Sequence, residues 1–209
     1  MNHVKQESLW TIDFTLVSVV NLFMAMSMYL LIVTIATYAT DTYHVSTSTA
    51  GLVASIFILG ALFGRFYGGK QIEVMGSKKM LMIGIIISVI VTMLYFVQGN
   101  IYFLIIVRLL HGIGLGLATT ATGTIVAQII PRSRSGEGIS YFSLGMVLTM
   151  AIGPLIGILL INYLGYTSLF VFSLMMGIIC LVISIPLKAP HVIEDLEEKV
   201  RQAPASASD

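Results

Sequence analysis

Long apolar runs separated by short polar breaks organise this chain of 209 residues. Six of these runs are long enough to cross a bilayer as helices, which takes about 20 residues for about 30 Å of hydrocarbon. We expect transmembrane helices over residues 14–38, 47–67, 80–97, 101–129, 141–164 and 169–187. Strands of a β-barrel would alternate apolar and polar residues, whereas runs such as 82–91 are apolar throughout. The pattern therefore predicts an all-α polytopic membrane protein.

Composition excludes several classes of protein. Hydrophobic residues make up 57% of the chain and charged residues 10%, whereas soluble domains carry about a quarter charged residues. A net charge of +1 gives no basis for nucleic-acid binding. The single cysteine, Cys180, provides neither a disulfide framework nor a thiolate metal site. The chain has no His-Glu-x-x-His helix or comparable constellation, so we expect no enzyme, cofactor or metal site.

The basic residues predict the orientation in the membrane. All lysines and arginines except Arg108 lie before the first span, in or beside alternate breaks, or after the last span: Lys5, Arg65, Lys70, Lys78, Lys79, Arg132, Arg134, Lys188, Lys199 and Arg201. Basic loops favour the cytoplasm, so we expect both termini to be cytoplasmic, in a plasma-membrane protein. The chain then divides into a cytoplasmic N-terminal segment (1–13), a six-helix transmembrane domain (14–188) and a cytoplasmic segment (189–209).

The last of these segments has a pattern of its own. Val192, Ile193, Leu196 and Val200 form an apolar stripe at helical spacing, which is typical of an amphipathic helix on a membrane surface. The alternative is a solvated stub. We expect the final residues to be a flexible tail.

Four polar residues within the spans are candidates for a substrate or proton pathway. Arg108 lies inside the fourth span, where a cation costs about 2.5–3.5 kcal/mol at the centre and is a functional candidate for that reason. His111, one turn further on, suits proton-linked chemistry. The alternatives are that Arg108 snorkels to the surface and that His111 is a packed, hydrogen-bonded residue. In the first span Asn21 and Tyr29 lie within about 80° of each other, and we expect both to face a central pathway.

Residues 69–79 carry an ordered set of glycines and charges: Gly69, Glu73, Gly76, Lys78 and Lys79. This segment resembles the Gly-x-x-x-Asp-Arg-x-Gly-Arg-Lys-Lys signature between helices two and three of the major facilitator superfamily. Glu73 stands at the Asp position, and Val74 and Ser77 replace two arginines. The resemblance implies a conformational loop that latches the two halves of a transporter. The alternative is an ordinary positive-inside loop.

Two further segments carry the same resemblance. The run from Arg108 through His111 and Gly112 to Gly114 is similar to the family's Arg-x-x-Gln-Gly-x-Gly signature. Residues 145–157, with Gly153 and Pro154, resemble the signature of its exporting, antiporter branch. Together they imply alternating access and proton-coupled efflux.

The residues of these two segments also have physical roles. Gly112 and Gly116 form a small-xxx-small pair that permits close helix packing. Pro154, flanked by Gly153 and Gly157, predicts a kink. The functional interpretation adds that this kink shapes the wall of a central cavity.

Six spans are half of the number that the resemblance implies for a complete transporter. Transporters of this superfamily contain two six-helix halves, each built from 3+3 repeats. We therefore expect an N-terminal half or a truncated form, with the lipid bilayer, a small drug-like or metabolite substrate, protons and a second six-helix half as partners. The alternatives are an importer of sugars or organic acids and a half that does not transport.

Overall fold

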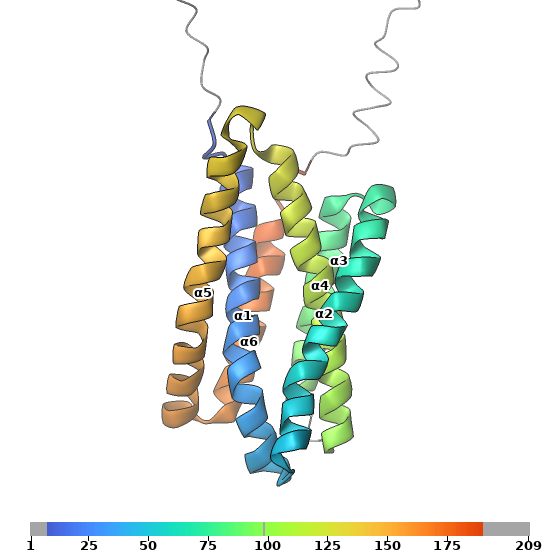
Figure 1. Ribbon diagram of the computed structural model, residues 1–209, viewed down its shortest axis with the longest axis vertical. Helices are drawn as coiled ribbons and strands as arrows, with labels where there is room; N and C mark the ends of the chain where they lie inside the picture. Colours follow the sequence, from blue (N-terminus) through green and yellow to red (C-terminus); the bar gives the residue numbers. More distant parts are fainter. Residues whose placement is uncertain (1–7, 98, 190–209) are drawn as a thin grey trace, which may run out of the picture.

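The computed structural model describes residues 8–97 and 99–189, which form a bundle of helices (Figure 1). The helices are α1 (Ile12–Tyr43), α2 (Thr47–Met75), α3 (Ser77–Leu94), α4 (Ile101–Ile129), α5 (Ser135–Leu164) and α6 (Tyr166–Ser184), with a 3-10 turn, η1 (Arg132–Arg134), before α5. Six candidate spans are long and apolar enough to cross a membrane. The predicted all-α class with six spans is confirmed. The predicted amphipathic stripe of residues 192–200 lies outside the described residues.

Several helices extend beyond the apolar runs that predicted them. α1 continues past residue 38 to Tyr43 and ends where His44 adopts a left-handed conformation, with φ 52°. α2 continues past residue 67 to Met75. Leaving the hydrocarbon does not end a helix, because its hydrogen bonds continue until a capping or left-handed residue interrupts them. The polar residues therefore marked the limits of the apolar spans and not the limits of the helices.

Residues 68–79, expected as a polar break, are almost entirely helical. Gly76 alone separates α2 from α3, with φ 83° and ψ 151°. Glycine adopts a positive φ without a steric penalty from a side chain, so the chain reverses within one residue. The Nζ atom of Lys78 donates a hydrogen bond to the carbonyl oxygen of Ile185 at 2.8 Å. This contact ties the start of α3 to the end of α6.

Both described chain ends lie at one end of the bundle (Figure 1), together with the α2–α3 and α4–α5 connections. We call this the basic end, because it carries Lys78, Lys79, Arg132, Arg134 and Lys188. The other three connections lie at the opposite end, where Tyr166 donates a hydrogen bond to Asp41. All connections are short, so neighbouring helices along the chain run antiparallel.

Glycines bring α2 and α4 into direct backbone contact. A β-carbon at Gly112 would collide with the carbonyl oxygen of Phe57, and one at Gly116 would collide with that of Ala61. Gly60 and Gly64 of α2 meet the carbonyl oxygens of α4 in the same way. The predicted small-residue pair thus packs against a matching pair on α2, as in close helix contacts within membranes.

α5 lies against α1 on one flank of the bundle (Figure 1). A β-carbon at Gly153 would lie 2.9 Å from the Cβ of Tyr29, and one at Gly157 would lie 2.8 Å from the Cγ2 of Thr34. Gly153 and Gly157 therefore let α5 approach α1 beside Pro154. The remaining surface of α5 is largely exposed and apolar, as at Val147.

Candidate functional site

Arg108 lies in the interior between α2, α3 and α4, and none of its surface is exposed. Its Nε donates a hydrogen bond to the carbonyl oxygen of Val53 at 3.3 Å, and its Nη1 donates one to the hydroxyl of Tyr95 at 3.5 Å. The guanidinium carbon is 4.4 Å from the centre of the Phe57 ring, within the range of a cation–π interaction. Arg108 is therefore held inside the bundle and does not snorkel.

Tyr95 joins the two residues that the sequence predicted as neighbours. Its hydroxyl lies 3.2 Å from the Nδ1 of His111 and also accepts from Arg108. His111 is buried, with 3% of its surface exposed, and its ring packs edge-on against Phe57. We refer to Arg108, Tyr95 and His111 as the buried triad.

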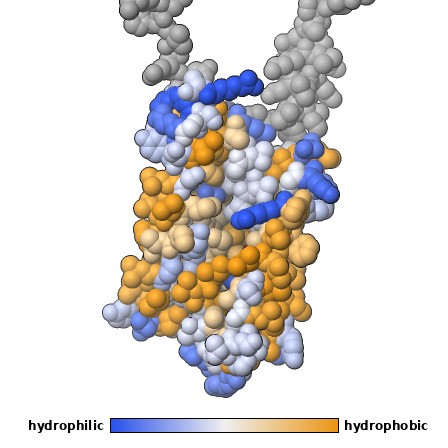
Figure 2. Space-filling view, in the orientation of Figure 1, coloured by the Kyte–Doolittle hydropathy of each residue, from blue (hydrophilic) through white to orange (hydrophobic). Residues whose placement is uncertain are grey.

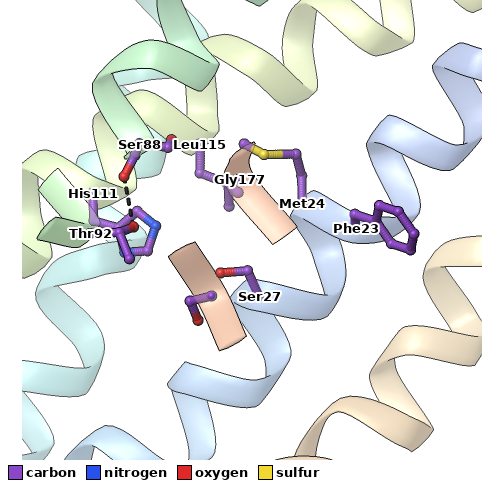
Figure 3. A pocket seen from close by; sticks show the side chains of 9 residues that line it. Phe23, Met24, Ser27, Ser88, Thr92, His111, Leu115 and Gly177 are labelled. Atoms are coloured by element: carbon purple, nitrogen blue, oxygen red, sulfur yellow. Dashed lines mark hydrogen bonds between the residues drawn. The ribbon is translucent and has the colours of Figure 1, made fainter. Parts of the chain in front are cut away.

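A small cavity lies beside His111 (Figure 3). Ser27 of α1, Ser88 and Thr92 of α3 and Ser173 of α6 line it together with His111. Its volume of about 10 Å³ is close to the space that one water molecule needs. The Oγ atoms of Ser88 and Ser173 are buried and have no hydrogen-bond partner in the described part of the chain. Such groups favour an internal water.

A larger groove lies between α1, α2, α4 and α5, with a volume of about 560 Å³. It falls within the range of about 300–1,000 Å³ that is common for small-molecule sites. In the space-filling view a pale, weakly hydrophilic strip separates orange flanks toward the basic end (Figure 2). The lining residues of this central groove are Asn21, Arg65, Thr119, Thr120, Gly123, Thr124, Ala127, Phe142 and Met146.

The four predicted pathway residues do not form one cluster. Arg108 and His111 belong to the buried triad, whereas Asn21 lines the central groove and its Oδ1 accepts a hydrogen bond from Thr122 at 3.2 Å. Tyr29 is half-buried where α1 meets Gly153 of α5, and it is not among the residues that line the groove. Three of the four predicted residues therefore lie in two separate places, the buried triad and the central groove, and Tyr29 lies in neither.

The residues of the predicted latch lie at the basic end. Gly76 forms the turn, while Glu73 and Lys79 are exposed and Lys78 bonds to the end of α6. Nothing lies within 4 Å of the position that a β-carbon on Gly69 would take. The surface around Gly69 on α2 is therefore uncovered by the described chain.

Sequence reasoning missed two residues of these sites. Tyr95 gave a weak signal, because it is one aromatic residue near the end of the third apolar run. The sequence groups Arg65 with the basic residues beside the break between the second and third spans, whereas the structure places it inside α2, where it lines the central groove. Its position before residue 67, within the predicted span, was the signal that could have found it. Among residues 8–97 and 99–189, no group of three or more His, Cys, Asp or Glu side chains could hold a metal ion.

Comparisons with known proteins relate this architecture to membrane transporters. A family model described as Major Facilitator Superfamily matches residues 17–207. The multi-drug resistance efflux pump PmrA of Streptococcus pneumoniae is 33% identical over 122 residues, which cover 58% of this chain and 30% of the pump. An uncharacterized MFS-type transporter of Methanocaldococcus jannaschii is 27% identical over 150 residues, 72% of this chain and 39% of that protein.

A solved structure shares the fold. The xylose transporter XylE from E. coli, in an inward open conformation, aligns with a TM-score of 0.73 at 15% identity. The alignment covers 90% of this chain and 50% of the XylE chain. The chain thus spans about a third of the length of the curated relatives it matches and half of this solved transporter.

Proposed function

The chain belongs to the major facilitator superfamily of membrane transporters, and we propose that it acts in proton-coupled efflux of small molecules by alternating access. The observation that carries the proposal is the central groove. It is open, is lined by both polar and apolar side chains, and has the volume of a small-molecule site. We propose that cargo binds there, in contact with Asn21.

We assign proton coupling to the buried triad. Arginine stays protonated throughout the physiological range, whereas a histidine ring can take up and release a proton. His111 contacts Tyr95 through its Nδ1 and also lines the small cavity. A water in that cavity would give its ring a partner for proton exchange. The alternative from the sequence, a histidine that is only packed and hydrogen-bonded, predicts no effect of His111 on coupling.

The proposed direction is outward. The resemblance of residues 145–157 to the antiporter signature supports efflux, and so does the similarity to the efflux pump PmrA. We further propose that a second six-helix half covers the central groove and meets the segment around Gly69 and Gly76, which then latches the two halves. The uncovered surface at Gly69 supports this arrangement.

Transport in proteoliposomes tests this function. The 209-residue chain is reconstituted, and three radiolabelled probes are offered: naphthalene-1-sulfonate, 1-methylquinolinium and xylose. Proton antiport predicts that one of the two amphiphilic ions accumulates when the lumen is the more acidic side, and that a protonophore abolishes the accumulation. Accumulation only when the lumen is the more alkaline side would instead indicate symport. A folded chain that moves none of the probes would favour a half that does not transport.

We also propose that the basic end faces the cytoplasm of a cell whose plasma membrane holds the protein. In a Cys180→Ala background, Lys79→Cys and Ser48→Cys place exposed thiols at opposite ends of the bundle. The positive-inside rule predicts that an impermeant maleimide labels Ser48→Cys on intact cells and labels Lys79→Cys only after permeabilisation. The reverse labelling pattern would place the basic end outside the cell.

A further inference from the structure

Arg65 is a cation in α2 that no carboxylate neutralises in the described part of the chain. It lies ten positions before the end of α2 at Met75, about 15 Å along the helix. Of the carboxylates in residues 8–97 and 99–189, none lines the central groove, and the ion pair among them joins Arg134 to Glu137. Arg65 therefore leaves a positive charge facing the groove. Ionisable residues within membrane spans that line a cavity are functional candidates.

The α4 wall of the groove offers hydrogen-bond acceptors. Thr120 donates its hydroxyl hydrogen to the carbonyl oxygen of Gly116 at 2.8 Å, and Thr124 donates to that of Thr120 at 3.0 Å. A hydroxyl has one hydrogen and two lone pairs, so these threonines can only accept from a molecule in the groove. The donors lie on the other side, in Arg65 of α2 and in the amide NH₂ of Asn21, whose oxygen is already bonded to Thr122.

Phe142 and Met146 of α5 add an apolar surface to the same groove. We propose that the central groove selects organic anions, and that Arg65 binds their carboxylate, sulfonate or phosphate group while the apolar body packs against Phe142 and Met146. Hydrogen bonds between a guanidinium and an anionic group are short and strong. This inference rests on the proposed transport function and names the class of its substrate.

Binding to the 209-residue chain in phosphatidylcholine nanodiscs tests the inference without requiring transport. Equilibrium dialysis with naphthalene-1-sulfonate should show saturable binding that the uncharged naphthalene-1-sulfonamide does not displace. Arg65→Gln should raise the Kd at least tenfold, which is the scale expected for loss of one hydrogen bond to a charged group. Arg65→Lys should raise it less, because lysine keeps the charge but not the planar fork.

Lys70→Gln is the matched control, because Lys70 is an exposed cation on the same helix that does not line the groove. It should leave the Kd unchanged. Three results would overturn the inference: no saturable binding of the sulfonate, equal competition by the sulfonamide, or an unchanged Kd in Arg65→Gln.

The two proposals fail in different ways. Arg65-dependent binding without any gradient-driven transport would contradict proton-coupled transport by the 209-residue chain on its own and leave the anion site standing. If 1-methylquinolinium moved with the gradient and Arg65→Gln left the Kd for naphthalene-1-sulfonate unchanged, only the anion site would be contradicted.

Discussion

Arg108→Lys is expected to lower the initial rate of pH-gradient-driven uptake about tenfold or more, although it keeps the positive charge. The guanidinium bonds to Val53 and Tyr95 at once and lies over the ring of Phe57. A lysine ammonium cannot reproduce this planar arrangement of donors. Losing one hydrogen bond to a charged group inside the protein corresponds to roughly a tenfold effect or more.

Two further substitutions separate the parts of the buried triad. Arg108→Ala removes both hydrogen bonds and the ring contact, and we expect it to abolish coupled uptake. Tyr95→Phe keeps the ring but removes the hydroxyl that contacts both Arg108 and His111, so it should reduce coupling in the same direction as Arg108→Lys. Rates are measured in proteoliposomes per amount of folded protein.

Arg132→Ala is the control for these substitutions, because Arg132 is an exposed cation at the basic end. It should leave the rate unchanged. If Arg108→Lys transported at the full rate, the fixed geometry of the guanidinium would have no role, and Arg108 would serve only as a buried positive charge.

The double substitution Gly112→Ala with Gly116→Ala should destabilise the bundle strongly, although it adds only two methyl groups. Each new β-carbon would collide with a backbone carbonyl of α2, and a backbone cannot move aside as a side chain can. Overpacking costs about 1–3 kcal/mol per site. Two sites give about 2–6 kcal/mol, and since each kcal/mol lowers the Tm of a chain of this size by about 2–4 °C, we expect the Tm of the purified protein to fall by roughly 4–24 °C.

The control lies on the same helix. Nothing lies within 4 Å of the position that a β-carbon on Gly123 would take, and alanine has a higher helix propensity than glycine. Gly123→Ala should therefore leave the Tm unchanged or raise it slightly. Equal Tm values for the double variant and the control would show that α2 and α4 are not in backbone contact.

The helices could be predicted from the sequence because each apolar run is long and each break is short. Their ends could not be predicted in the same way. Hydrophobicity reports where the chain leaves the hydrocarbon, whereas the end of α2 depends on the backbone conformation of Gly76. The resemblance of three separate segments to one transporter family is confirmed by the match over residues 17–207.

The sites were only partly predictable. Arg108 and His111 could be paired because helical periodicity places residues i and i+3 on neighbouring parts of one face. Tyr95, just after the end of α3, and Phe57 of α2 reach the same place, and a single sequence contains no information on which helices are neighbours. Arg65 was missed because its charge was assigned to the orientation of the chain, and its position in the groove depends on how α1, α4 and α5 pack around it.

The glycine contact between α2 and α4 also has a mechanical consequence. No layer of side chains separates the two backbones at Gly60, Gly64, Gly112 and Gly116. Because the backbones are in direct contact, we expect α2 and α4 to tilt together as one unit. Each has 29 residues, a length of about 43 Å. A tilt of about 5° around one end would displace the other end by about 4 Å. This displacement is roughly the diameter of a methyl group and would change the width of a pathway beside these two helices.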